Sequence, residues 1–226
     1  MKLIHLSVGV LLANNFTCSN TTLSQNTEII EEVSKAENYV SDIKIPHGFR
    51  VESKSQFATF LGNLNLKSDK TVYLYDGSLK PNQDAQYAVL DISVGDKNLQ
   101  QCADAVIRLR AEYLFSQKRY NEIEFKTVSG TYLNFKEWLK GKRYRLKGNS
   151  LIAYQISPQQ NTRDAFDNYL EFVFSYCGTA SLGSSLVRKA LDEINAGDVF
   201  LKPGSPGHAV IVMATAINNK KKKYFF

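Results

Sequence analysis

The chain has 226 residues, of which 43% are hydrophobic and 12% aromatic, and its formal net charge is +6. This composition excludes a disordered or collagen-like chain and is typical of a folded protein with enough apolar residues for a full core. Three cysteines are too few for a disulfide framework, so the fold is expected to depend on its core.

The first residues, MKLIHLSVGVLLANNFTCSN, have the pattern of an export signal. Lys2 precedes an apolar run from Leu3 to Ala13, which is too short to cross a bilayer but suits the core of such a signal. A buried first strand is the alternative interpretation. Cys18 stands where a lipoprotein signal would be cut and lipidated. We therefore expect residues 1–18 to direct export to the periplasm or cell envelope, with a lipid anchor at Cys18 as the only link to a membrane.

A polar linker, 19–42, follows, and the spacing of its apolar residues predicts a short amphipathic helix. We expect one α+β domain over 43–226. Within it, SQFATFLGNL (55–64) predicts a helix. KTVYLYDGSLK (70–80), which ends in an Asp-Gly turn, and AQYAVLDISV (85–94) predict two strands.

The most periodic segment is NLQQCADAVIRLRAEYLFSQ (98–117). Its apolar residues recur at alternating steps of three and four, namely Leu99, Cys102, Val106, Leu109 and Tyr113. This spacing traces one face of an α-helix. Either Asp96 or Asn98 would cap it, which places Cys102 in its first or second turn.

The second half of the chain mixes both kinds of element. NEIEFKTVSGTYLNFKEWLKGKRYRL predicts a strand, a turn and a short segment carrying Trp138. TRDAFDNYLEFVFSYCGTASLGSSLVRKAL predicts helix with an interruption at Gly178, and residues 209–217 predict a strand. Helices and strands do not alternate regularly, which favours an α+β fold over a doubly wound sheet.

Cys102 and His208 are the residues best placed for catalysis. A helix N-terminus and a nearby imidazolium both favour the thiolate form of a cysteine. A cysteine early in a helix, followed by a histidine that opens a strand, is the arrangement that papain-type chemistry needs. The alternative is that Cys102 packs in the core, as Cys177 is expected to do, and that His208 is a polar residue at the rim.

Four stretches, YLYDGSLKPNQ, AVLDISVG, LQQCADAVIRLRAEYL and GDVFLKPGSPGHAVIV, resemble a family of exported bacterial proteins known as domain of unknown function 4846. GHAVIVMATAINNKKKKYFF is also similar to the His-Ala-Val strand and hairpin of papain-type peptidases, and GDVFLKPGSPGHAVIV resembles a stretch of NlpC-like cell-wall peptidases. The peptidase resemblance implies a papain-like (NlpC-like) α+β fold, with an N-terminal helix carrying the cysteine and an antiparallel sheet carrying the histidine. It implies Cys102 as the nucleophile and His208 as the base.

In papain-type enzymes the residue that orients the histidine follows the second strand of the hairpin. Here Asn218-Asn219 would make the turn and Tyr224-Phe225-Phe226 would begin the return strand, so the domain is expected to be C-terminally truncated. Asp91 would orient the histidine or face solvent. Gln83 and Gln101 are candidates for donating to an oxyanion. Neither metal-ligand spacing nor a phosphate-binding glycine loop occurs, so no metal or cofactor is expected.

The leading hypothesis is an exported cysteine-dependent amide hydrolase that acts on a peptide or cell-wall peptide. The alternatives are a non-catalytic binding module for an anionic surface polymer and a structural lipoprotein. Two basic clusters favour anionic partners. They are Lys140, Lys142, Arg143, Arg145 and Lys147, and the run Lys220 to Lys223. No nucleic-acid-binding motif accompanies them, so nucleic acid is not expected as a partner.

Overall fold

The computed structural model describes residues 38–226. The expected export signal, the lipidation site Cys18 and most of the polar linker with its short helix lie outside the described residues. Within residues 38–226, no helix has both the length and the apolar character needed to cross a membrane.

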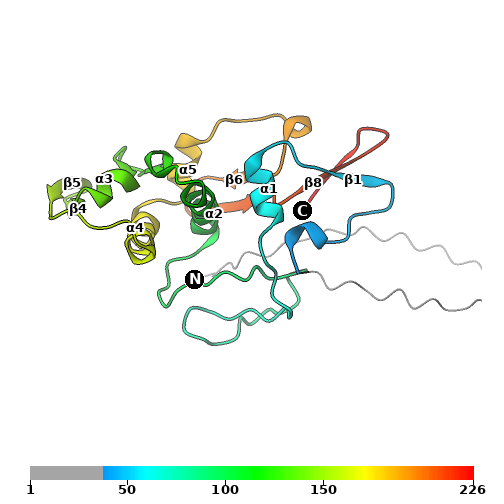
Figure 1. Ribbon diagram of the computed structural model, residues 1–226, viewed down its shortest axis with the longest axis horizontal. Coiled ribbons are helices and arrows are strands. Elements are labelled where there is room, and N and C mark those ends of the chain that lie inside the picture. Colours follow the sequence, from blue (N-terminus) through cyan, green and yellow to red (C-terminus); the bar gives the residue numbers. More distant parts are fainter. Residues whose placement is uncertain (1–37) are drawn as a thin grey trace, which may run out of the picture.

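The described residues form a mixed α+β structure with four small antiparallel sheets. In Figure 1 the pair β4-β5 lies at one end and the sheet with β1 and β8 at the other, with α2 between them. The α-helices are α1 (Gln56–Gly62), α2 (Cys102–Ser116), α3 (Phe135–Leu139), α4 (Arg163–Tyr176) and α5 (Thr179–Ser185), with 3-10 turns η1 (Val40–Asp42), η2 (Tyr120–Glu122) and η3 (Leu191–Glu193). The strands are β1 (Phe49–Glu52), β2 (Glu124–Lys126), β3 (Tyr132–Asn134), β4 (Lys142–Lys147), β5 (Ser150–Gln155), β6 (Val199–Lys202), β7 (His208–Ile211), β8 (Thr215–Asn218) and β9 (Lys223–Phe225). The α+β class is therefore confirmed.

One sheet has three strands in the order β1-β8-β9, and the other three sheets are the strand pairs β2-β3, β4-β5 and β6-β7. The turn and return strand predicted after β8 are confirmed by the β8-β9 hairpin. The single strand predicted over 209–217 is wrong, because the chain leaves one sheet after β7 and joins another at β8. Between them the amides of Met213 and Ala214 donate to the carbonyl of Phe226, which replaces the ladder that one continuous strand would need.

Helix α2 begins later than predicted. The residues before it form tight turns, since the Leu99 amide donates to the Lys97 carbonyl and the Gln101 amide to the Leu99 carbonyl. Neither Asp96 nor Asn98 caps the helix; Gln101 is the N-cap residue. The backbone N–H of Gln101 also donates to the carboxylate of Asp104 at 3.0 Å, which fixes the first turn.

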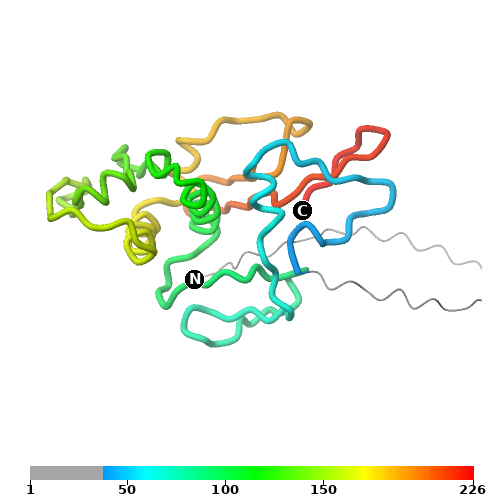
Figure 2. Tube along the Cα trace, in the orientation of Figure 1, coloured from blue at the N-terminus to red at the C-terminus, as the bar shows by residue number. Residues whose placement is uncertain are grey.

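The two strands predicted between α1 and α2 are absent from the described structure, where residues 63–101 hold only isolated bridges. Figure 2 shows this segment as a long loop from cyan to green. The side chain of Gln83 bonds to both backbone groups of Val72 and to the Lys80 carbonyl. Side-chain bonds thus satisfy backbone groups that a ladder would otherwise pair. The Asp-Gly turn is confirmed, with Gly77 at φ +79°.

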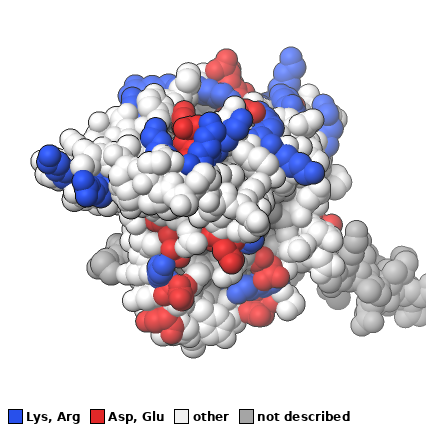
Figure 3. Space-filling model, turned by 60° about the vertical axis from the view of Figure 1, so that its left-hand side comes forward, with Lys and Arg blue, Asp and Glu red and all other residues white. Residues whose placement is uncertain are grey.

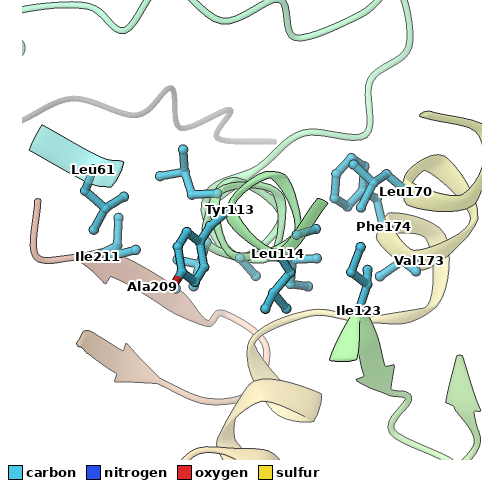
Figure 4. Packing of buried hydrophobic residues seen from close by; sticks show 14 of the residues in the cluster. Leu61, Tyr113, Leu114, Ile123, Leu170, Val173, Phe174, Ala209 and Ile211 are labelled. Atoms are coloured by element: carbon cyan, nitrogen blue, oxygen red, sulfur yellow. The ribbon is translucent and has the colours of Figure 1, made fainter. Parts of the chain in front are cut away.

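Helix α2 lies at the centre of the core. In Figure 4 its Tyr113 and Leu114 lie between Ala209 and Ile211 of β7 on one side and α4 on the other. Glu112 accepts hydrogen bonds from Arg108 on its own helix and from Arg163, which ties α2 to α4. The element that carries Cys102 is therefore held on both sides.

The helix predicted over the 162–191 stretch is confirmed as α4 and α5, with the interruption at Gly178, but it ends at Ser185, and residues 186–190 are not helical. Thr162 caps α4 by accepting from the Ala165 amide at 3.2 Å. Cys177 ends α4 in an extended conformation and lies in the core, as predicted.

Candidate functional site

Cys102 is the first residue of α2. Its side chain is partly buried and packs against the core cluster, on the helix face that the sequence periodicity predicted. The first amides of an α-helix have no partner within the helix, and the helix dipole is positive there. The start of α2 thus offers a thiol beside free N–H donors.

The starts of α2 and β7 each lie near the junction between α4 and α5. On the α2 side, burial and then the nearby charge of Asp104 raise the pKa of Cys177. On the β7 side, the hydroxyl of Thr179 donates to the Gly204 carbonyl at 3.0 Å. Gly207 lies so close to Thr179 that a Cβ at this glycine would collide with the threonine side chain.

The later parts of α2 and β7 also lie near each other. Just after β7, the Val212 carbonyl accepts from the Gly197 amide at 2.8 Å. Gly197 is pressed against the ring of Phe57, which contacts the ring of Tyr113 in α2 at 5.1 Å between centroids. Helix α2 and strand β7 therefore pack against each other, and in Figure 4 the strand passes across the side of the helix, which is seen end-on.

The side chain of His208 belongs to the outer face of its sheet. In the β6-β7 ladder it lies opposite Lys202. Ala209 and Ile211 are buried toward α2, whereas Val210 is 44% exposed, so alternation puts His208 on the face of Val210. No hydrogen bond joins it to Cys102 in residues 38–226; such bonds are often long before substrate binds. Their pairing stays a prediction.

The other cysteine within residues 38–226 is in an environment that disfavours its reactive form. Cys177 is buried, and its thiol donates to the Lys126 carbonyl at 3.6 Å. Burial raises its pKa to about 12. The thiolate is the reactive form of cysteine, so this thiol is expected to be inert near neutral pH.

The three predicted supporting residues, Gln83, Gln101 and Asp91, lie in different parts of the fold. Both N–H groups of the Gln83 amide are engaged by the carbonyls of Val72 and Lys80, so it is not free to donate to an oxyanion. Gln101 adjoins Cys102 as the N-cap residue and is partly buried. Asp91 faces solvent on the long loop, with its amide bonded to the Asn65 carbonyl. Of the three, only Gln101 is beside the thiol.

Sequence reasoning missed the buried carboxyl of Asp104. Its residue is 7% exposed, and Oδ1 has no hydrogen-bond partner within the described part of the chain. Burial raises its pKa from 3.8 to about 6, against the opposing effect of the Gln101 amide. The sequence held one indication of it: Asp104 follows the candidate nucleophile Cys102 by two residues, at the third position of the helix.

Asp104→Asn is expected to remove a pH dependence of stability. Because the folded pKa lies above the unfolded one, protonated Asp104 favours the fold at low pH, and this stabilisation is lost as pH rises through about 6. A difference of about two between the folded and unfolded pKa corresponds to up to about 3 kcal/mol in the free energy of unfolding. Urea unfolding at about pH 4.5 and pH 7 should show the variant gaining stability over the wild type as pH rises. An unchanged difference would show that Asp104 is ionised at both values.

The basic cluster over 140–147 is only partly available to a partner. Arg143 is buried, lies 3.7 Å from the ring centroid of Trp138 and donates to the Trp138 carbonyl at 2.6 Å. Lys140 pairs with Glu137 at 2.8 Å. Figure 3 shows lysine and arginine side chains gathered in the upper part of the visible face, with acidic groups among them. Arg145 and Lys147 remain exposed.

No group of three or more histidine, cysteine, aspartate or glutamate side chains within residues 38–226 is arranged to hold a metal ion. The model of the family described as Domain of unknown function (4846) matches residues 40–226. No curated protein and no solved structure matches the chain. The comparisons therefore supply a family without supplying an activity.

Proposed function

Because the chain belongs to the family described as domain of unknown function 4846, whose description assigns no activity, we propose a function from its own residues. We propose that the protein is a cysteine-dependent amide hydrolase with a papain-like arrangement. Its substrate is a peptide or cell-wall peptide. The observation that supports this is that α2 and β7 pack against each other, with Cys102 as the first residue of one and His208 as the first of the other.

The proposed reaction has two stages. The Cys102 sulfur attacks the carbonyl carbon of the amide, while the His208 imidazole, turned from the outer face of β7 toward α2, takes the thiol proton and passes it to the leaving amine. The negative oxygen that forms is stabilised by the free amides at the start of α2 and by its dipole. Water then attacks the thioester, with His208 accepting its proton, and releases the acid and the free thiol.

The proposal also includes export. Residues 1–18 would direct the chain to the periplasm or cell envelope, where cell-wall peptides occur, and Cys18 would carry a lipid anchor.

Alkylation of Cys102 and Cys177 tests whether Cys102 is the nucleophile. With iodoacetamide at about pH 8, Cys102 should react at least about a hundredfold faster than Cys177, because a thiol with pKa about 12 is ionised in only about one molecule in ten thousand. Mass spectrometry of tryptic peptides measures both rates in the folded protein. His208→Ala should slow alkylation of Cys102 at about pH 7 but less at about pH 10, where hydroxide in the solvent can take the proton in place of the imidazole.

Equal labelling of Cys102 and Cys177 in the folded protein would contradict the proposal. So would an alkylation rate of Cys102 that is the same in His208→Ala as in the wild type. Alkylation in urea, where both thiols are exposed, is the control that each peptide is detected.

A non-catalytic binding module for an anionic surface polymer is the second candidate. The exposed side chains of Arg145 and Lys147 favour it. The burial of Arg143 against Trp138 counts against it, because a charge used within the fold is not offered to a polymer. We therefore prefer the hydrolase.

A further inference from the structure

A pocket of about 330 Å³ lies beside the middle of α2, between α5, β2, β6 and β7. Its volume is at the lower end of the range in which small-molecule sites occur. Much of its lining is apolar, including Phe57, Val106, Ile107, Leu182, Val199 and Ile211. Cys177 and Ser181 also line it. The pocket is therefore shaped for a small apolar group.

Arg110, one of the two cationic side chains that line this pocket, lacks a polar partner within the described residues. Arg110 is partly buried and makes neither a hydrogen bond nor an ion pair with any residue of the described chain. Its guanidinium lies over the rings of Phe57 and Tyr113, at 5.2 and 5.5 Å from their centroids. Burial, and then the charge of Arg119, lower the pKa of Arg110. The flat group is thus held in place with its N–H donors unused.

The neighbouring charges are largely matched. Arg119 is paired with Glu122, so neither needs Arg110. At the other side of the pocket Glu124 and Lys126 carry opposite charges. Lys126 lies over the ring of Tyr132 at 5.5 Å, and Glu124 accepts from an asparagine amide. With Arg110 and Lys126 against Glu124, the lining carries one net positive charge, and Glu122, which favours the charged form of Arg110, lies outside the lining.

We propose that this pocket binds a small amphiphile that carries one carboxylate on an apolar body. The apolar body fills the space between Val106, Leu182 and Ile211. The carboxylate meets the guanidinium of Arg110, whose fork of N–H groups matches two carboxylate oxygens.

The site also has a geometric relation to the proposed nucleophile. Cys102, Val106 and Arg110 follow one another at steps of four along α2, so successive members lie about 6 Å apart along one side of the helix. A substrate whose apolar end occupied the pocket would extend toward Cys102. This second role rests on the proposed function, whereas binding of the amphiphile does not.

Calorimetric titration of the full chain with octanoate and with octanol tests the site. The wild type should bind both, and octanoate more tightly. Arg110→Gln should lower the affinity for octanoate by about tenfold or more, the usual cost of losing a charge-assisted hydrogen bond. The same substitution should change the affinity for octanol by less than about twofold. Ser185→Phe, which adds a ring at the pocket lining, should abolish both.

Three results would overturn the proposal: no binding of octanoate, equal affinity for octanoate and octanol, or an Arg110→Gln variant that binds octanoate as the wild type does. Circular dichroism confirms that each variant is folded. Cys102→Ala is the matched control and should bind octanoate normally, so failure of the pocket and failure of the hydrolase are separate outcomes.

Discussion

Replacing Cys102 by alanine is expected to abolish amide hydrolysis, with a loss in kcat/KM of at least about a thousandfold. The reason is that no other group within residues 38–226 offers both a thiol and the free amides of a helix start at this junction. Cys177 cannot replace it, because burial raises its pKa to about 12. Peptides and cell-wall fragments incubated with each variant, and analysed for new termini by mass spectrometry, provide the measurement.

His208→Ala is expected to lose nearly as much activity, since a nucleophile and its base act as one unit and their effects do not add. Arg145→Ala is the control and should keep full activity, because its side chain is exposed on β4. Hydrolysis that survives Cys102→Ala would contradict the account.

Phe135→Ala is expected to destabilise the fold by about 3–5 kcal/mol. Phe135 is fully buried at the start of α3. Its ring contacts those of Phe166 and Tyr169 at 5.3 and 5.2 Å between centroids. The substitution leaves a cavity between α3 and α4 and removes edge-to-face ring contacts, so both the transfer of apolar surface and the packing are lost.

Guanidinium unfolding measures this loss as a shift of the midpoint at nearly constant slope. Val187→Ala is the matched control, since Val187 is 88% exposed and the change is expected to cost less than about 0.5 kcal/mol. A cost for Phe135→Ala below about 1.5 kcal/mol would show that the aromatic cluster can close around the cavity.

The helices were predictable because their apolar residues repeat at helical spacing. Helix α2 and the pair α4 and α5 fall where the sequence pattern puts them, although the start of α2 was misplaced. The strands predicted before α2 were wrong, since the alternation of 85–94 is compatible with a loop whose backbone is held by glutamine side chains. Sequence pattern does not reveal such long-range side-chain bonds.

The sequence predicted the individual residues of the candidate site but not how their elements pack together. Cys102 at a helix start and His208 at a strand start follow from local pattern. The packing of α2 against β7 depends on contacts far apart in the chain, such as Gly197 against Phe57. The buried Asp104 and the unpaired Arg110 depend on packing in the same way. No property of the single sequence distinguishes them from surface charges.

The most direct test is the separation between the Cys102 sulfur and the His208 imidazole in a crystal structure of the protein trapped with a thiol-reactive peptide. We expect the peptide to be bonded to Cys102, and the nearer ring nitrogen of His208 to lie within about 4 Å of the sulfur. A peptide that leaves Cys102 unmodified, or an imidazole that stays on the outer face of β7 beside Lys202, would contradict the proposed catalytic pair.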